Sequence, residues 1–142
     1  MTDPVRSLMD KARQALDDAH LLAAHHRVEA AINRVYYAAF HAARAALLTL
    51  GETPKSHKGV RTRFDYHFIE TGRLAREVGQ VLSISENARR SADYDALTVF
   101  DTHAAADLIT EVESFVQAVE ALISSTPDEA PLHAYFTGHS GE

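Results

Sequence analysis

The chain of 142 residues contains no cysteine, and it has only four prolines and six glycines. Without cysteine it forms neither disulfides nor thiolate metal sites, and a cytoplasmic location is the simplest expectation. The few prolines and glycines argue against a low-complexity or disordered chain. No apolar run approaches the roughly 18 residues that a membrane-spanning helix requires, so we expect no membrane association. The acidic residues spread through segment 1–20 also argue against a signal peptide.

Several motifs of enzymes and metalloproteins are absent as well. The sequence has no Glu-x-x-His pair of the kind that binds di-iron in helical bundles, no glycine-rich phosphate loop and no His-Glu-x-x-His. The neighbours His25 and His26, and the pair His103 and Asp107, stand alone and are expected to face solvent. We therefore expect neither a metal nor a cofactor.

The charge and composition are those of a single globular domain. With 46% hydrophobic and 24% charged residues, the composition is ordinary for such a protein. The formal net charge of −6 argues against a protein that coats nucleic acid non-specifically. It leaves room for a local basic patch.

Apolar residues recur at helical spacing along the chain, and no segment has a convincing strand pattern. The predicted helices span residues 4–24, 28–50, 60–69, 74–92 and 102–124. Gly79 lowers the helix propensity of the fourth segment by about 1 kcal/mol relative to alanine. We predict an all-α fold, an up-down four-helix bundle with one additional short helix, over residues 1–124. Residues 125–142 are predicted to form a C-terminal tail, either disordered or pinned by Tyr135 and Phe136.

The helix predicted for residues 28–50 is apolar on two sides. On a helical wheel, one side holds Ile32, Val35, Tyr36, Ala39, Ala43, Ala46 and Leu47. The opposite side holds Ala30, Arg34, Tyr37, Ala38, His41, Ala45 and Leu48, where a surface helix would be charged. Full enclosure is hard to arrange in a small bundle, so we infer a homodimer with this helix in or beside the interface. The alternative is a short segment, or the tail, lying over the second side.

Arg34 and His41 lie two turns apart on that second side. An arginine that holds phosphate and a histidine that transfers a proton near neutral pH are the parts of a metal-independent ribonuclease. His41 would deprotonate a ribose 2′-hydroxyl, and Arg34 would stabilise the charge that develops on the phosphate. The alternative is a histidine that only hydrogen-bonds across the dimer interface.

The segment KSHKGVRTR, residues 55–63, concentrates positive charge in an otherwise acidic chain. Its basic side chains beside the amides of a helix start predict a phosphate or RNA contact. The alternative is a solvated loop that keeps the protein soluble.

The segment ENARRSADYD, residues 86–95, places Arg89 on the inward line of its helix. A buried charge needs a partner, and Asp93, four residues later, is the natural one. Asn33 or Tyr36 could contribute if the two helices are adjacent, whereas Arg90 and Tyr94 point more outward. Arg89 is therefore interpreted as half of a buried Arg–Asp brace, or alternatively as a ligand-facing arginine.

Three segments in order, NRVYYAAFHAARAALL, KSHKGVRTRFDYHFIETGRL and ARRSADYD, resemble the small prokaryotic HEPN-domain proteins. The resemblance covers about residues 5–124. It implies a helical bundle that forms a homodimer; many relatives are encoded beside a minimal nucleotidyltransferase, and several act as RNA-cleaving toxins in toxin–antitoxin or defence modules. The nuclease branch uses an arginine, four to six residues, and then a histidine late in the chain. Arg34 and His41 have this spacing on an earlier helix, whereas no histidine follows Arg90 before His103.

Together these patterns predict a dimeric HEPN-type protein that engages RNA or nucleotide, as a metal-independent ribonuclease toxin with a nucleotidyltransferase antitoxin as partner. The alternative is a non-catalytic module that binds a nucleotide or docks a nucleotidyltransferase. The catalytic candidates are Arg34 and His41. The candidate RNA or nucleotide contacts are Asn33, Tyr37, Lys55, His57, Lys58, Arg61, Arg89, Arg90, Asp93 and Tyr94.

Overall fold

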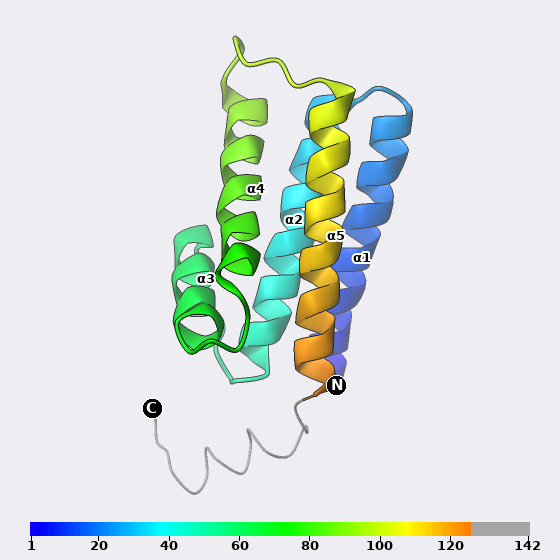
Figure 1. Ribbon diagram of the computed structural model, residues 1–142. Coiled ribbons are helices and arrows are strands. Elements are labelled where there is room, and N and C mark those ends of the chain that lie inside the picture. The colour runs from blue at the N-terminus through cyan, green and yellow to red at the C-terminus, as the bar shows by residue number, and fades with distance from the viewer. Residues whose placement is uncertain (126–142) are drawn as a thin grey trace, which may run out of the picture.

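The computed structural model describes residues 1–125, and all its regular elements are helices over that range (Figure 1). They are α1 Asp3–Ala24, α2 Val28–Leu48, α3 His57–Phe64, the π-helical turn η1 Asp65–Ile69, α4 Arg76–Tyr94 and α5 Thr102–Ser124. The predicted all-α fold is confirmed. Within it, α3 begins three residues earlier than predicted, because the Ser56 side chain caps the helix by accepting a hydrogen bond from the Gly59 amide at 2.9 Å.

The four long helices α1, α2, α4 and α5 lie alongside one another, and the chain reverses direction at each step between them (Figure 1). The short α3 lies beside the first half of α4. This is the up-down arrangement that the spacing of the apolar residues predicted. The tail predicted for residues 125–142, with Tyr135 and Phe136, lies from residue 126 onward outside the described residues.

The second helix, α2, is the centre of the bundle. It contacts α1, α3, α4 and α5, and within its length only Glu29 and Ala30 are exposed. Seven of its alanines are fully buried: Ala31, Ala38, Ala39, Ala42, Ala43, Ala45 and Ala46. Their small side chains let the neighbouring helices approach closely from several directions.

This enclosure corrects one inference drawn from the sequence. Ala38 and Ala45 lie on the side for which we expected cover from a second molecule, or alternatively from a short segment or the tail, yet helices of the same chain bury both completely. The reasoning that full enclosure is hard to arrange was wrong, because it neglected how little space alanine occupies. The homodimer itself stays a prediction, and it now depends on the half-buried residues of α2 alone.

Gly79 has a packing role that helix propensity does not reveal. A Cβ atom at this position would lie 2.9 Å from Ile69 Cγ1 and 3.0 Å from Asp65 Oδ1. The glycine therefore lets α4 pack directly against η1, whose wide turn is closed by the hydrogen bond from the Glu70 amide to the Asp65 carbonyl.

The two C-terminal helices pack unequally. The apolar stripe of α5 is buried from Leu108 to Ile123, apart from the half-buried Leu122. On α4, Leu82 and Ser85 are buried, whereas Val78 and Val81 are only half-buried. Neither of these helices nor any other in residues 1–125 is long and apolar enough to cross a membrane.

Candidate functional site

One stripe of α2 is only half-buried, whereas most of the helix is fully buried. Its members are all half-buried and recur every three or four residues, so they share one flank: Arg34, Tyr37, Phe40, His41, Arg44 and Leu48. We call this stripe the α2 seam. Its rings pack on one another, with Tyr37 and Phe40 edge to face at 6.1 Å between centroids. Its two arginines each lie over a ring, Arg34 over Tyr37 at 5.0 Å and Arg44 over Phe40 at 5.8 Å.

His41 lies in the middle of the α2 seam and is electrostatically unusual. The pKa of His41 is lowered to about 4, mainly by burial and then by the nearby cations Arg44, Lys11 and Arg34 in that order. Its Nδ1 atom is buried and has no hydrogen-bond partner among residues 1–125. The imidazole is therefore uncharged at neutral pH, it keeps an unused ring nitrogen, and it is surrounded by three positive charges.

Arg34 is held in place from two sides. Its Nε and Nη2 atoms donate to the Asn33 Oδ1 atom at 3.3 and 3.1 Å, and its guanidinium lies on the Tyr37 ring. The same ring lies 6.1 Å from that of His41. Arg34 and His41 thus flank one tyrosine on one helix flank, which is the arrangement that their spacing predicted.

At one end of the α2 seam, a brace joins α2 to α4. Arg89 Nη1 donates to Asp93 Oδ2 at 3.1 Å, and Asn33 Nδ2 donates to the same oxygen at 3.3 Å. The Arg89 guanidinium also lies 5.2 Å from the centre of the Tyr36 ring. With only 11% of its side chain exposed, Arg89 is the inward-facing half of the predicted Arg–Asp brace, and both suggested contributors, Asn33 and Tyr36, take part. Because Asn33 also holds Arg34, the brace fixes the seam's first cation.

At its middle, the α2 seam is covered from one side by His57 at the start of α3. The His57 ring lies 4.6 Å from that of Phe40, and its Nδ1 atom lies 2.5 Å from the Tyr36 hydroxyl oxygen. Burial lowers the pKa of His57, with help from Arg89, and burial raises the pKa of Tyr36 well above its ordinary value. The Tyr36 hydroxyl therefore stays protonated and donates a hydrogen bond to the neutral imidazole of His57. His57 serves this contact rather than standing free.

The basic segment 55–63 is divided by the fold. Arg61 pairs with Glu86, a carboxylate only 5% exposed, and Arg90 donates to the same carboxylate at 3.0 Å. These two predicted RNA contacts thus share one carboxylate of the same chain, and the Arg90 side chain stays 58% exposed. Lys55 and Lys58 are exposed on the surface and remain available to a ligand. Tyr94, 77% exposed at the end of α4, is available as well.

A second ion-pair cluster fastens the loop after α2 to α3. Arg63 binds Glu52 through two hydrogen bonds of 2.7 and 2.8 Å, and His67 binds the same carboxylate. The hydrogen bond from Arg63 is the main reason why the pKa of Glu52 falls to about 2. Arg63 is the second cation of the basic segment, after Arg61, that pairs with a carboxylate of the same chain.

Two residues of the site were missed in the sequence. Arg44 follows His41 by three positions, so its place on the same flank could have been read from the helical period. Lys11 belongs to α1, and only the packing of α1 on α2 brings its charge near His41. No sequence pattern around Lys11 predicts that its charge lies near His41.

The chemistry of the α2 seam is that of an anion site with aromatic platforms. Arginine and lysine bind phosphate oxygens, exposed ring faces stack on bases, and a neutral imidazole accepts a proton. Within residues 1–125, no three histidine, aspartate or glutamate side chains lie together as a metal site would require. His25, His26 and His103 are exposed, as predicted.

Comparison with known proteins gives a consistent set of relatives. The HEPN domain matches residues 5–122 of the chain. The chain is 37% identical over 113 residues to a "UPF0332 protein" of Thermotoga maritima, which covers 80% of this chain and 86% of that protein. It is 39% identical over 94 residues to "UPF0332 protein glr0978" of Gloeobacter violaceus, covering 66% and 75%. It is 32% identical over 118 residues to "Putative toxin MJ0605" of Methanocaldococcus jannaschii, covering 83% and 87%.

Proposed function

The chain belongs to the HEPN domain family, which confirms the resemblance drawn from its sequence, and from this premise we propose that it is a toxin-like cytoplasmic protein that binds and cleaves RNA along the α2 seam. The observation that carries the proposal is the uncharged His41, with its unused Nδ1 atom, among Lys11, Arg34 and Arg44. A relative of similar length carries a toxin name, which supports the same role.

In this proposal His41 is the general base. It takes the proton of a ribose 2′-hydroxyl, whose oxygen attacks the adjacent phosphorus and forms a 2′,3′-cyclic phosphate. The bond from phosphorus to the 5′-oxygen breaks, and that oxygen takes a proton from water. Arg34, oriented by Asn33 and Tyr37, stabilises the added negative charge on the phosphate. No step requires a metal ion.

Binding of RNA would itself prepare the base. A histidine with a pKa of about 4 is a weak base at neutral pH. A phosphate placed among Lys11, Arg34 and Arg44 would offset the cations that lower this pKa and would favour the charged imidazole. The bound substrate thus raises the basicity of the group that acts on it.

The proposal includes a homodimer that joins two α2 seams. Tyr37, Phe40 and Leu48 are half-buried in one chain, and a second copy would bury the remainder of these apolar side chains. A two-fold axis beside the seam would bring two sets of cations to one cleft, which suits an extended polyanion. A nucleotidyltransferase partner, as the antitoxin, completes the proposal.

The direct test is cleavage of a single-stranded RNA in the presence of a chelator. Wild-type protein should cleave, and His41→Ala should lower the rate by at least about 100-fold, the usual contribution of a general base. His103→Ala, an exposed histidine on α5, is the matched control and should keep full activity. Undiminished cleavage by His41→Ala would remove the proposed base.

Two observations favour a second candidate function, a non-catalytic module that binds a nucleotide or docks a nucleotidyltransferase. The low pKa of His41 and the hydrogen bonds that tie Arg34 to Asn33 both suit a binding surface better than a reactive one. This version predicts no RNA turnover, and a stable complex on co-expression with the product of an adjacent nucleotidyltransferase gene. RNA cleavage that His41→Ala abolishes would contradict it.

A further inference from the structure

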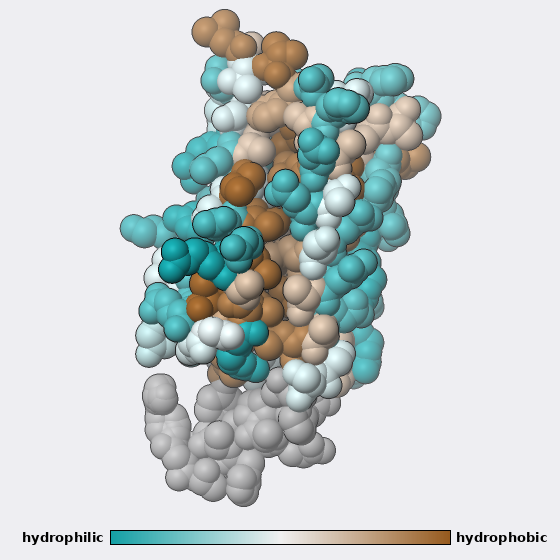
Figure 2. Space-filling model, viewed as in Figure 1, coloured by the Kyte–Doolittle hydropathy of each residue, from teal (hydrophilic) through white to brown (hydrophobic). Residues whose placement is uncertain are grey.

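A groove runs between α4 and α5 where the two helices pack less closely than the rest of the bundle. It encloses about 430 Å³, and its apolar floor is formed by Val78, Val81 and Ile84 from α4 with Phe115 from α5. Ile84 leaves 48% of its surface exposed at the edge of this groove. Figure 2 shows the apolar strip between the two helices as a continuous brown band on the face of the molecule. The incomplete burial of Val78 and Val81 is thus a property of an open surface.

The rim of the groove is acidic. Glu77 on α4 and Glu111 on α5 line it, and both are exposed. Neither carboxylate forms an ion pair within residues 1–125. Asp107 lies one turn before Glu111 on the same flank of α5 and is also exposed.

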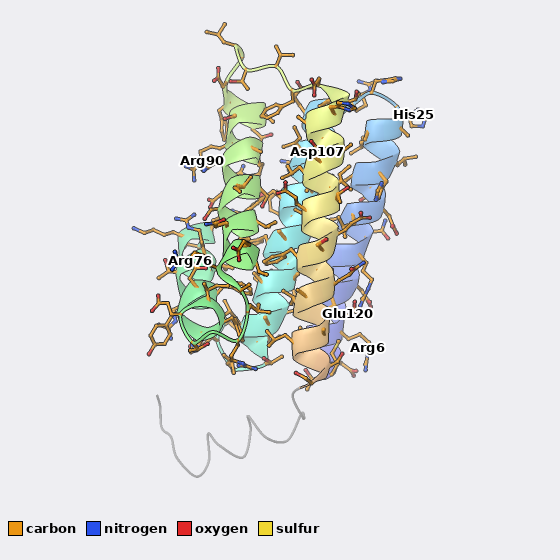
Figure 3. The ribbon with its side chains drawn as sticks, in the orientation of Figure 1. Arg6, His25, Arg76, Arg90, Asp107 and Glu120 are labelled. Carbon is orange, nitrogen blue, oxygen red and sulfur yellow. The ribbon has the colours of Figure 1, made fainter. Side chains whose placement is uncertain are left out.

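Among the described residues, neither lysine nor arginine lines this groove. From Thr102 to Ser124, α5 contains four acidic residues and neither lysine nor arginine. On α4, Arg76 and Arg90 extend from the side of the helix that faces away from α5 (Figure 3). The groove therefore combines an apolar floor with unpaired negative charge on both edges.

We infer that this groove docks an amphipathic helix of a partner protein, with apolar side chains on one face and lysine or arginine on both flanks. Helices bind grooves of this kind through apolar anchors at i, i+3, i+4 and i+7. The apolar residues of α4 in the groove span Val78 to Ile84, which is about 9 Å or nearly two helical turns. The floor would bury the anchors, and Glu77 and Glu111 would pair with the basic flanks.

Charge argues against two other occupants. A second copy placed on this groove by a two-fold axis would bring the acidic rims of both chains together, and like charges repel. The C-terminal segment 126–142 contains Asp128, Glu129 and Glu142 with neither lysine nor arginine, so it would add negative charge to an acidic rim. A basic helix from another protein is the occupant that satisfies both the floor and the rim.

This inference rests on the docking half of the proposed function and not on RNA cleavage. The groove belongs to α4 and α5, whereas the proposed base and its cations belong to α1 and α2. The acidic groove therefore gives the partner a surface of its own, separate from the seam that would hold RNA.

The test uses fluorescein-labelled synthetic peptides of about 18 residues, long enough to form an isolated helix. One peptide places leucine at i, i+3, i+4 and i+7 with lysine elsewhere, and its matched control replaces every lysine with glutamate. Fluorescence anisotropy measures their binding to the full-length protein at about 0.15 M salt, where unspecific charge attraction is screened. We expect the leucine–lysine peptide to bind and the leucine–glutamate peptide not to bind.

Three variants decide whether the groove is the site. Ile84→Glu should lower the affinity for the leucine–lysine peptide at least about tenfold, because a few buried apolar contacts dominate the binding energy of such an interface. Glu77→Lys combined with Glu111→Lys should reverse the preference toward the glutamate peptide. Glu70→Lys, an exposed acid outside the groove, should leave binding unchanged. Thermal unfolding of each variant checks that the fold is intact, and RNA cleavage by Ile84→Glu should equal that of the wild type.

Four outcomes would overturn the inference. The first is no binding of the lysine peptide. The second is an equal effect of Glu70→Lys and Ile84→Glu, which would show unspecific charge attraction. The third is dissociation of a dimer by Ile84→Glu in sedimentation, which would assign the groove to a second copy. The fourth is tighter peptide binding after Tyr135→Ser and Phe136→Ser, which would assign it to the C-terminal segment. A failed cleavage assay alone would leave the groove untouched.

Discussion

The α2 seam and the groove between α4 and α5 are opposite in chemistry within one small bundle. The seam gathers Lys11, Arg34 and Arg44 around a neutral histidine in a chain whose net charge is −6. The groove carries Glu77 and Glu111 beside an apolar floor and lacks lysine and arginine along its lining. The net charge of a chain therefore says little about what any one surface binds, because each helix flank has its own charge.

The two surfaces also differ in how tightly the fold holds them. Arg34 is oriented by Asn33, which is itself bound to Asp93, so its position is set by a network that reaches α4. The acidic residues of the groove have no such partners within the described residues. A fixed cation suits precise placement of one phosphate, whereas exposed rim carboxylates without ion pairs among the described residues suit a partner that docks as a whole helix.

The largest expected effect separates the two surfaces by function. Arg34→Ala should lower RNA cleavage by about 100-fold or more, because one lost donor to the developing charge costs that much in comparable sites. It should leave binding of the leucine–lysine peptide unchanged. Ile84→Glu should show the converse pattern in the same two assays. If either variant impairs both activities equally while its thermal unfolding is normal, the separation is wrong.

The second largest effect concerns the brace of Arg89, Asp93 and Asn33, which supports the α2 seam and not the groove. Asp93→Ala leaves the guanidinium of Arg89, only 11% exposed, without its carboxylate. We expect the free energy of unfolding to fall by about 2–3 kcal/mol, since removal of one partner strands a largely buried charge. Glu111→Ala at the groove, where no partner is lost, should change it by less than about 0.5 kcal/mol. Urea denaturation of both variants measures the difference, and equal stability of the two would contradict the brace.

A smaller effect follows from charge at the α2 seam. Lys11→Ala should weaken RNA binding several-fold and lower the slope of log affinity against log salt by about 1, as for one lost phosphate contact. Glu77→Ala should not weaken binding and should leave the slope unchanged. Filter binding of one RNA at several salt concentrations gives both slopes. An unchanged slope for Lys11→Ala would place the phosphates elsewhere.

The smallest effect is a pH dependence of stability. The pKa of His41 is about 4 in the folded chain and 6.5 as an ordinary value, so the unfolded chain binds the extra proton between these limits. Stability should therefore decrease as the pH falls from about 7.5 to 5, and His41→Gln should flatten that decrease. His103→Gln serves as the control and should keep the wild-type slope. Glu52, with a pKa of about 2, contributes only at lower pH. His57, whose pKa burial also lowers, contributes in the same direction, so part of the decrease should persist in His41→Gln. A wild-type slope in His41→Gln would show that another group titrates.

The sequence predicted the features that depend on short-range periodicity. The four long helices and the brace of Arg89 with Asp93 follow from spacings of three and four residues along one helix. The shared flank of Arg34 and His41 follows from the same rule. The pairing of Arg90 with Glu86, also four residues apart, could have been found in this way.

Features set by contacts between distant segments could not be predicted. Burial of Ala38 and Ala45 depends on how closely the neighbouring helices approach α2, which no local pattern encodes. Neutralisation of Arg61 depends on Glu86, 25 residues later on another helix. The charge of Lys11 reaches His41 only through the packing of α1 on α2. The last two features decide which cations are available to a ligand, so the candidate site was less predictable than the fold.

The α2 seam holds a half-buried, neutral His41, and the cations beside it, Lys11, Arg34 and Arg44, are proposed to bind a phosphate. An NMR titration of the His41 ring, assigned with His41→Gln, tests this claim most directly, once in the free protein and once with a non-cleavable 2′-O-methyl RNA bound. The account predicts a pKa near 4 in the free protein and a rise of about one unit or more on binding, as the RNA phosphate offsets the neighbouring cations. A pKa near 6.5 in the free protein, or no shift when the RNA binds, would contradict it.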